Sequence, residues 1–411
     1  MATKLQIVVP DPGLHELGGH HPATAISLYE SFLDCNDVEL RIFCHHNFEL
    51  EKFNNQINIT PFFNSDYYHY FYENPTYGDC QFYIRQLSKE YYDFFILLNS
   101  EQSDSQKLVL FHTMTWQHII ALTLSLEQIN DTFASPVKIP QIVVFLVYGA
   151  STNFTNSKHQ SRTFLNYSLA VRVLSKTGLV QIFASEYELT QFYTNVLSFD
   201  VMLHPCLLIG RINEKCKILS KNINKNAIIL YLGDAKIEKG FTKLPLLLSR
   251  LMLHAKLADL EIVIQFTNNN ISKEISNAYD QIRTLANVNQ NIRIINEFLS
   301  AKAMQNLLTK SKAIIFNYNE SIYENQSSGV LWLSAYYDLK IASFSNNWVL
   351  KEAKRMGLQS KLVDYDNVDR QLTELLDSSV IQKTKYYYEF FQDFSQWLLK
   401  LAMWRDKNES K

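Results

Sequence analysis

The chain is poor in glycine, with 11 glycines in 411 residues, whereas average usage is roughly 7%. Glycine fits where a side chain cannot, so each one in a glycine-poor chain is informative. Six of the eleven lie in three short loops, at Asp11–His20, Gly233–Phe241 and Asn325–Gly329. Each loop is expected to follow a strand and to open a helix, which is where α/β folds bind phosphates and other ligands.

Cysteine is also scarce and carries no pattern. The five cysteines are Cys35, Cys44, Cys80, Cys206 and Cys216. None forms a C-x-x-C pair, and none lies near histidine at zinc-ligand spacing, which argues against a structural zinc site. An odd number of unpatterned thiols suits the reducing cytosol.

Long apolar runs and an excess of charge are absent too. The first residues lead directly into a strand, without the apolar stretch of a signal peptide. No segment has the 18 uncharged apolar residues that a membrane span needs. The net charge of −2 gives no electrostatic footprint for nucleic acid. We therefore expect a cytoplasmic protein that does not bind nucleic acid.

Several catalytic signatures are missing. No G-x-G-x-x-G follows a strand, so the fingerprint of NAD binding is absent. Neither G-x-S-x-G nor a P-loop occurs. Asp364-Tyr365-Asp366 spells the D-x-D of metal-dependent transferases, but Asp366 or Asn367 more simply caps a helix over Val368–Leu376.

What the sequence does contain is an alternation of short apolar strands and amphipathic helices. This rhythm predicts parallel sheets covered on both faces. In the first half, strands are expected at Leu5–Pro10, Val38–Cys44, Phe94–Leu98, Leu108–Phe111, Gln141–Val147 and Leu179–Ala184, and helices at His21–Leu33, Thr115–Ile129, Thr163–Thr177 and Glu186–Asn195. The polar, aromatic stretch 45–78 stays unassigned.

The second half repeats the rhythm after a polar stretch. Strands are expected at Ala227–Leu232, Leu260–Phe266, Ile292–Asn296, Ala313–Phe316 and Lys340–Phe344, and helices at Phe241–Ala255, Lys273–Leu285, Ala301–Lys310 and Ser328–Tyr337. The sequence thus predicts two Rossmann-like domains, 1–205 and 227–379, joined by a linker at 206–226. The tail 380–411 is expected to be helical over Val380–Leu401, capping the second domain or packing back on the first. Two such domains leave a cleft, a usual place for a ligand.

The loop Gly233–Phe241 is the strongest single signal. A glycine turn exposes backbone N–H groups, and the start of a helix favours an anion there. Lys239, before Gly240, could add a point charge to a diphosphate. The alternative is a solvated lysine beside an ordinary turn.

The three loops together resemble the retaining GT-B glycosyltransferases of the family-four type. The segment ILYLGDAKIEKGFTKLP resembles their donor-phosphate loop, and Ser321–Phe344 resembles their later serine-glycine helix start. DPGLHELGGHHPA resembles a subset that begins with Asp-Pro and Gly-Gly-His-His. The resemblance implies an α/β GT-B fold, with an acceptor-side first domain and a nucleotide-sugar donor domain.

The chain departs from the family at named positions. The family's paired glutamates fall near Gln326 and Ser334, and Asp234 replaces the arginine that many members carry. Gly-x-Pro-Val becomes Leu-Lys-Ile-Ala at 339–342. The donor-phosphate function therefore transfers better than the catalytic or ribose-binding function.

The resemblance carries diphosphate binding onto Gly233, Lys239, Ser327, Ser328 and Gly329; the other site residues are candidates because of their places in loops and at strand ends. Donor binding falls to Gly233, Lys236, Lys239, Gly240, Tyr323, Glu324, Ser327, Ser328 and Gly329, and Gly18, Gly19 and His21 form the opposing cleft wall. Candidates for catalysis are His20, His112 and Glu297, each at or near a strand end; for His112 a plain polar cap is the alternative. No metal site is expected, because adjacent histidines diverge on a helix and no carboxylate stands at i+4 spacing.

The predicted function is metal-independent transfer of a hexose-like sugar from a UDP- or GDP-sugar to a hydroxyl, with retention, in bacterial surface-glycan or glycoconjugate synthesis. No cofactor is expected beyond the sugar nucleotide. The acceptor would be a glycan, a lipid-linked glycan or a protein, with peripheral membrane contact left open. The alternatives are a non-catalytic GT-B-like binding or scaffold protein and a nucleotide-sugar epimerase.

Overall fold

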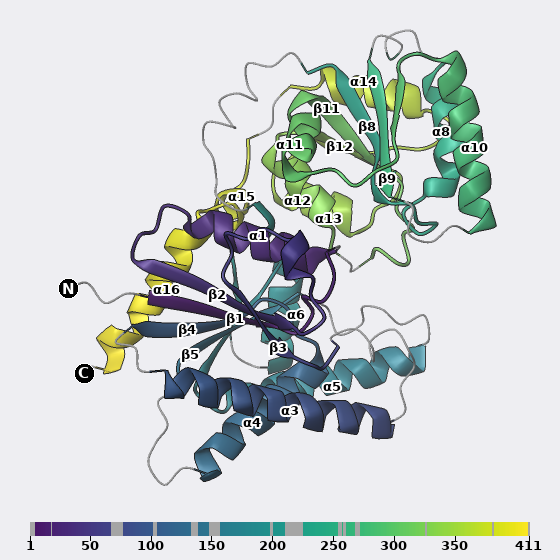
Figure 1. Cartoon of the computed structure of the whole chain (residues 1–411). Coiled ribbons are helices and arrows are strands. Elements are labelled where there is room, and N and C mark those ends of the chain that lie inside the picture. The colour runs from purple at the N-terminus through teal and green to yellow at the C-terminus, as the bar shows by residue number, and fades with distance from the viewer. Residues whose placement is uncertain are drawn as a thin grey trace. The chain divides into compact units, whose positions relative to one another are not determined.

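In the computed structural model, the chain forms two compact units (Figure 1). The first comprises Met1–Ile212 and Gln392–Lys411, and the second Asn213–Phe391. The residues that the structure describes are 5–17, 19–66, 77–101, 105–132, 139–147, 157–197, 200–209, 225–253, 257, 260–267, 272–324, 327–379 and 382–409.

The first unit is built on a seven-stranded, all-parallel sheet of order β3-β2-β1-β4-β5-β6-β7. Its strands are β1 (Leu5–Asp11), β2 (Val38–His45), β3 (Ile59–Phe63), β4 (Gln106–Phe111), β5 (Gln141–Leu146), β6 (Val180–Ala184) and β7 (Met202–Leu203). In register, Asp11 at the end of β1 lies beside Cys44 of β2.

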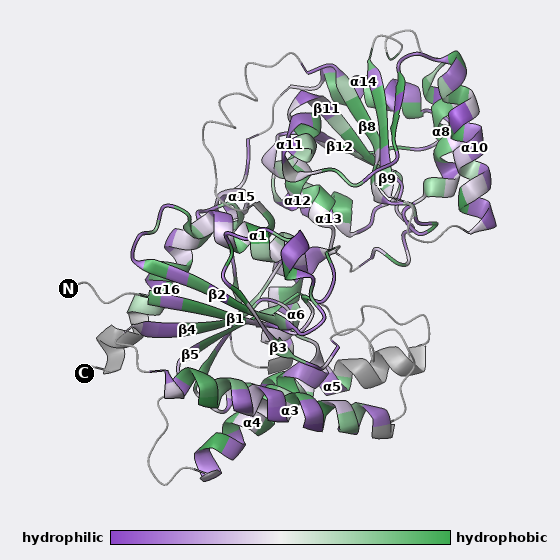
Figure 2. Cartoon of the chain, in the orientation of Figure 1, coloured by the Kyte–Doolittle hydropathy of each residue, from purple (hydrophilic) through white to green (hydrophobic). Residues whose placement is uncertain are grey.

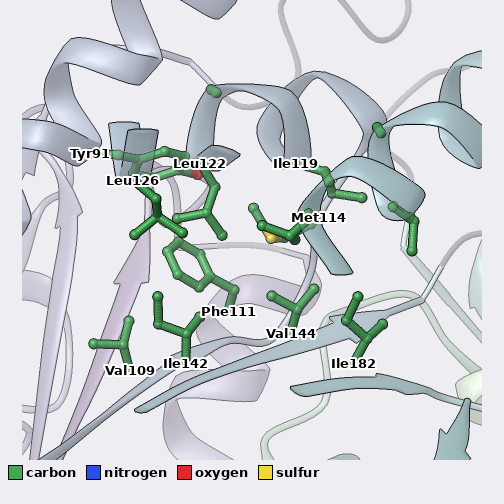
Figure 3. Close-up of a cluster of buried hydrophobic side chains, with 14 of the residues drawn as sticks. Tyr91, Val109, Phe111, Met114, Ile119, Leu122, Leu126, Ile142, Val144 and Ile182 are labelled. Atoms are coloured by element: carbon green, nitrogen blue, oxygen red, sulfur yellow. The ribbon is translucent and has the colours of Figure 1, made fainter. Parts of the chain in front are cut away.

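Both faces of this sheet are buried, because alternate strand residues enter two separate cores. Val109, Phe111 and Val144 pack on one face with Leu122 and Leu126 (Figure 3). The residues between them in the strands point to the other face. This explains why β5 from its second residue on (IVVFL) and the end of β4 (LVLF) are continuously apolar rather than alternating; Figure 2 shows green stretches in the strands.

Helices cover each face of the first sheet. One face carries α3 (Tyr77–Ser100), α4 (Trp116–Thr132), α5 (Ser157–Ser175) and α6 (Tyr187–Leu197), and the other α1 (His20–Phe32) and the C-terminal α16 (Phe394–Glu409). The short 3-10 turns η1 (Leu50–Lys52) and η2 (Leu207–Ile209) complete the unit. In α16, Trp397 packs edge-on against Phe183, with ring centroids 5.0 Å apart.

The second unit repeats the design with a six-stranded parallel sheet of order β10-β9-β8-β11-β12-β13. Its strands are β8 (Ala227–Asp234), β9 (Glu261–Thr267), β10 (Ile292–Ile295), β11 (Ser311–Phe316), β12 (Lys340–Ser343) and β13 (Ser360–Leu362). Its helical segments are η3 (Phe241–Lys243), α8 (Leu244–Leu251), α10 (Lys273–Val288), α11 (Ala301–Lys310), α12 (Gly329–Tyr336), α13 (Trp348–Arg355), α14 (Val368–Asp377) and α15 (Lys385–Phe390). Helices α8, α10 and α14 share one core with the sheet, and α11, α12 and α13 lie on its other side (Figure 1).

The strand expected at Phe94–Leu98 is wrong, because these residues belong to helix α3. Tyr91, Phe94 and Leu98 are all buried, at the i, i+3, i+7 spacing of one helical face. A short apolar run within a buried helix has the same pattern as a buried strand, unless the residues before and after it are considered too. Strands β3 and β7 and helix α13 were not predicted.

The single tail helix over Val380–Leu401 is also wrong: α15 and α16 are separate helices. Asp393 divides them, because its carboxylate accepts the N–H of Gln396 at 3.0 Å, as a residue before a helix start does. Likewise, the side chain of Asn367 makes no cap bond before α14. The Asp364 carboxylate instead accepts the backbone N–H groups of Asp366 and Asn367 at 3.1 and 2.9 Å.

Among the described residues, no helix has the length and apolarity needed to cross a membrane.

Helices α3 and α4 are joined by a buried histidine whose protonation should control stability. The Thr115 N–H donates to His118 Nδ1 at 3.3 Å, so the proton lies on Nε2, which is 2.9 Å from Tyr83 Oη. Burial lowers the pKa of His118 from 6.5 to about 3. Below pH 6.5 the unfolded chain therefore takes up a proton that the folded chain refuses.

We expect this histidine to contribute a loss of about 1.4 kcal/mol of unfolding free energy per pH unit, from about pH 6.5 toward pH 3. Urea unfolding between pH 8 and 5 measures the slope. His118→Gln removes the titrating group and should flatten it by about that amount; an unchanged slope in the variant would contradict the assignment.

Candidate functional site

Each sheet reverses its strand order once, next to its first strand. The reversal falls between β1 and β4 in the first unit and between β8 and β11 in the second. At such a switch point the loops leave in opposite directions, which opens a crevice outside the carboxyl ends of the strands where α/β proteins bind ligands. Candidate functional residues lie at both switch points.

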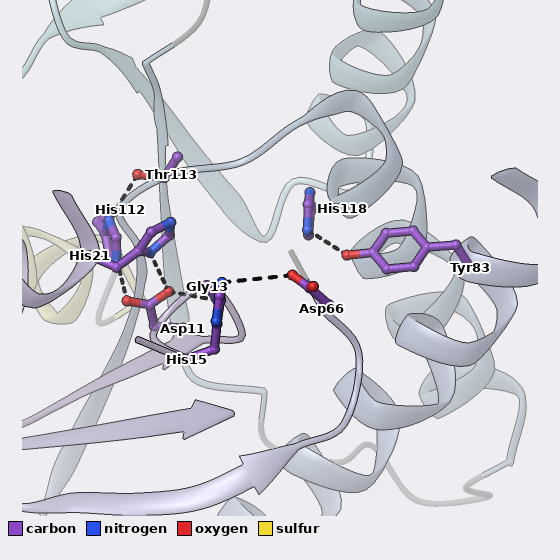
Figure 4. A network of polar contacts seen from close by, with 9 residues as sticks. All are labelled: Asp11, Gly13, His15, His21, Asp66, Tyr83, His112, Thr113 and His118. Atoms are coloured by element: carbon purple, nitrogen blue, oxygen red, sulfur yellow. Dashed lines mark hydrogen bonds and ion pairs between the residues drawn. The ribbon is translucent and has the colours of Figure 1, made fainter. Parts of the chain in front are cut away.

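In the first unit, Asp11 binds two histidines from different elements (Figure 4). Asp11 ends β1, His21 lies in the first turn of α1, and His112 directly follows β4. His21 Nδ1 lies 2.6 Å from Asp11 Oδ1, and His112 Nε2 lies 2.9 Å from Oδ2. All three side chains are buried. The carboxylate thus holds two imidazoles at the switch point.

Gly13 makes this arrangement possible. Its N–H donates to Asp11 Oδ1 at 3.1 Å, and the His21 ring lies directly over its Cα. A Cβ at this position would stand 2.2 Å from His21 Cε1. Any side chain here would therefore push the imidazole off the carboxylate.

The charges in this cluster favour an ionised carboxylate. Burial raises the pKa of Asp11, but the charges of His21 and His112 and their hydrogen bonds outweigh it and hold that pKa well below its usual range. His20, whose ring centroid lies 4.2 Å from that of His21, has its pKa lowered by burial and by the two neighbouring histidines. The hydroxyl of Thr113 lies 2.9 Å from His112 Nδ1 and completes the network.

Asp11, His21 and His112 are also a set of residue types that could hold a metal ion, with ligand atoms within 4.8 Å of one another. Zinc bonds of about 2.0–2.1 Å in tetrahedral geometry would place neighbouring ligand atoms about 3.4 Å apart. The observed 2.6 and 2.9 Å separations are shorter and suit hydrogen bonds. In this structure the three groups are therefore joined by hydrogen bonds through the Asp11 carboxylate.

In the second unit, the loop after β8 encloses an ammonium group. Gly233 has φ 114°, and Lys239 Nζ lies 3.3 Å from where its Cβ would be, so the absent side chain makes room for the lysine. Burial lowers the pKa of Lys239, although the Asp234 carboxylate opposes this. No carboxylate of the described residues pairs with this ammonium within 4.0 Å. Among the described residues, its charge is therefore not neutralised by an ion pair.

The loop after β11 packs against the same turn. Gly240 has φ 77°, and a Cβ there would lie 2.2 Å from the Asn317 carbonyl oxygen. The Asn319 N–H donates to the Glu238 carbonyl at 2.8 Å. Asn317, in turn, accepts the Tyr365 hydroxyl at 2.6 Å. Gly240, the second glycine of this loop, thus allows the loops after β8 and β11 to come into contact.

The predicted helix start at Ser328–Gly329 lies beside this pair of loops. Ser328 Oγ is 3.3 Å from Tyr318 Oη and makes no cap bond to α12, which begins at Gly329. Tyr323 is buried, with its ring centroid 4.3 Å from that of Tyr318. Ser327 is half-buried and Glu324 is exposed. Tyr318, in the loop after β11, contacts both Ser328 and Tyr323. Because this loop packs against the turn with Lys239, Tyr323, Ser328 and Gly329 lie near that turn.

Glu297 connects to the glycine turn only through its backbone. Gln265 Oε1 accepts the Gly233 N–H at 3.0 Å, and Gln265 Nε2 donates to the Glu297 carbonyl at 2.8 Å. The Glu297 side chain is exposed and lines a hollow of about 580 Å³ between β10 and α11. Lys236 is likewise exposed, and its N–H is bound to Tyr231 Oη at 3.1 Å.

Sequence reasoning found His21 and His112 but missed Asp11, the residue that joins them. The argument that the paired histidines diverge and have no carboxylate at i+4 considered only local spacing, whereas the partner comes from the end of a strand. A polar residue closing an apolar strand, LQIVVPD, was the available signal. Gly19, with φ 85°, precedes α1; Gly18 lies outside the described residues.

The contact between Gly13 and His21 can be tested by a double-mutant cycle. Gly13→Ala should cost about 1–3 kcal/mol of unfolding free energy, because the new methyl group displaces the imidazole. In a His21→Ala background the same change should cost little, since the ring is gone. Additive losses in urea unfolding would show that the contact does not determine the fit.

Comparisons with known proteins bear on the fold. No protein-family model matches the chain, and no curated protein matches it by sequence. Solved structures do match over nearly the full length. Sucrose-phosphate synthase from Thermosynechococcus elongatus aligns with a TM-score of 0.56 and 9% identity, covering 99% of this chain and 100% of that one.

Two further structures are similar to the same extent. A UDP-forming α,α-trehalose-phosphate synthase from Burkholderia xenovorans gives a TM-score of 0.56 at 13% identity, with coverage of 99% and 98%. UDP-GlcNAc 2-epimerase from Methanocaldococcus jannaschii gives 0.52 at 12% identity, with coverage of 98% and 100%. The two all-parallel α/β sheets of this chain therefore form the GT-B fold, which these solved structures share.

Proposed function

We propose that this protein transfers a sugar from a nucleotide-diphosphate donor to a hydroxyl acceptor. The second unit would hold the diphosphate, and the first would handle the proton of the hydroxyl. The GT-B fold supports sugar-nucleotide chemistry at the level of the fold alone, so the proposal depends on what stands at each switch point.

The observation that carries the proposal is the Lys239 ammonium. It is half-buried, it lies against Gly233, and no carboxylate of the described residues neutralises it. Breaking a glycosyl–phosphate bond develops negative charge on the departing diphosphate, so a positioned cation stabilises the transition state more than the ground state. Ser328 and the start of α12 at Gly329 supply a hydroxyl and backbone N–H groups nearby.

The Asp11 network suits proton transfer. With the carboxylate accepting from His21 Nδ1 and His112 Nε2, the lone pair of each imidazole, in its unprotonated form, lies on the opposite nitrogen. A carboxylate that fixes the tautomer and stabilises the imidazolium is the arrangement that makes histidine a general base. We assign His21 as the base for the acceptor hydroxyl and His112, held between Asp11 and Thr113, as the group that positions the Asp11 carboxylate.

The finer parts of the proposal follow from the family resemblance. These are retention at the anomeric carbon, independence from metal ions, and glycan, lipid-linked glycan or protein acceptors. Gln326 and Ser334 stand where that family has glutamates, so the ribose and the reacting sugar must be held by other groups here. Tyr323 and Glu324 are the nearest candidates along the chain.

Nucleotide-sugar epimerisation is the second candidate, and the acid–base network of Asp11, His21 and His112 specifically favours it. Epimerisation moves a proton at a sugar carbon, which a paired acid and base can do. The structural similarity to UDP-GlcNAc 2-epimerase adds only the shared fold. Release of an epimerised sugar nucleotide without acceptor would establish this function in place of transfer.

Donor binding can be measured by thermal shift with UDP, GDP, ADP and their sugars. A ligand at about 100 times its Kd adds about 2.7 kcal/mol to native-state stability. We expect one nucleotide to raise Tm, and Lys239→Ala to weaken its binding by about tenfold, since it removes one charge-assisted contact. Lys302→Ala, an exposed lysine on α11, is the matched control. Absence of a shift with every nucleotide would refute the donor site.

The role of the Asp11 network can be measured by turnover. Asp11→Asn keeps the size of the side chain but removes its charge, so we expect kcat to fall by about a hundredfold, within the range for a general base. The acid limb of the pH profile should move to lower pH, because the imidazolium loses its neighbouring carboxylate. His46→Ala, an exposed histidine of the same unit, should leave turnover unchanged. Full activity of Asp11→Asn would exclude a role in proton transfer.

A further inference from the structure

Helix α5 (Ser157–Ser175) has two faces of opposite character. Its inner face is anchored in the first core by Tyr167, Ala170, Val171 and Leu174, each at most 2% exposed. This packing fixes the rotation of the helix about its axis. The outward face is therefore a fixed surface of the protein.

That outward face is apolar. Leu165, Leu169 and Val173 are 55%, 51% and 46% exposed, at the i, i+4, i+8 spacing of one helical stripe. Single exposed leucines are common on protein surfaces and need no explanation. Three in successive turns form a continuous ridge, which indicates that the ridge has a partner.

The described charges on α5 and directly after it have one sign. Arg172 and Lys176 are both exposed next to Val173, and neither forms an ion pair with the described residues. In the sequence no Asp or Glu occurs between Asp131 and Glu186, while five Lys and Arg residues do. In a chain of net charge −2 this is a marked local excess of positive charge.

We propose that this face of α5, made of Leu165, Leu169, Arg172, Val173 and Lys176, docks on the surface of an anionic lipid bilayer. The apolar side chains would enter the boundary between headgroups and acyl chains. The two basic side chains would extend along it to reach lipid phosphates. The helix would lie in the plane of the membrane without crossing it.

The same features disfavour a second copy of the chain as the occupant. A two-fold interface brings the same patch together from both subunits, and this patch offers cations with no carboxylate to pair them. Interfaces between proteins are also depleted in lysine and enriched in aromatic residues, and the exposed face of α5 has no aromatic side chain among its described residues. Anionic headgroups satisfy both the charge and the apolar ridge.

The experiment is co-sedimentation of the full chain with vesicles. Binding is expected to vesicles of phosphatidylcholine with about a third phosphatidylglycerol, to weaken with salt, and to be weak on phosphatidylcholine alone. Arg172→Gln with Lys176→Gln should weaken binding by about thirtyfold, since each basic residue contributes about fivefold. Leu165→Ser with Leu169→Ser should weaken it by at least about tenfold.

Leu253→Ser is the matched control, because Leu253 is 81% exposed in the second unit and should not affect binding. Thermal unfolding of each variant shows whether the fold is kept, as expected for exposed positions. Failure of the wild-type chain to bind anionic vesicles would overturn the proposal. So would equal binding by the α5 variants, or a concentration-dependent dimer that the leucine variants abolish. None of these readouts depends on sugar transfer.

Discussion

The carboxylate of Asp11 is the constraint on which the first unit's site depends. A buried anion is tolerated only when its oxygens are satisfied, and here an imidazole from α1, an imidazole after β4 and the N–H of Gly13 all bind it. Three separate chain segments must therefore meet at one point before the charge can be buried. The cluster both orders the functional groups and specifies how the loops around β1 are folded.

In this protein, glycine mainly allows other groups to approach the backbone closely. At Gly13 the missing side chain admits an imidazole, at Gly233 it admits an ammonium, and at Gly240 it admits the backbone after β11. Only the last two also need a positive φ. A chain that uses glycine sparingly has placed it where a functional group or a neighbouring strand end must approach the backbone.

The fold was largely predictable, because alternating apolar strands and helices leave few arrangements other than two covered parallel sheets. Errors arose where local pattern was ambiguous, as in the buried face of α3, or where one side chain interrupts a helix, as Asp393 does before α16. The loops with Lys239 and with His21 were found from glycine placement and family resemblance. Asp11 was not, because its partners lie 10 and 101 residues away in the sequence. Spacing rules relate residues within one helix or strand, whereas this site is assembled from three separate segments of the chain.

The return of α16 to the first unit has a consequence for how the chain is made. Gln106 and Gln141 donate to carbonyls of Ala402 and Leu401, and Phe145 and Phe183 pack against the same helix. The second unit is contiguous, whereas the first needs residues from both ends of the chain. During synthesis the second unit can close as soon as its own residues have emerged, but one face of the first sheet stays uncovered until α16 has been synthesised. Of the two units, the one whose synthesis begins first is thus the second to be completed.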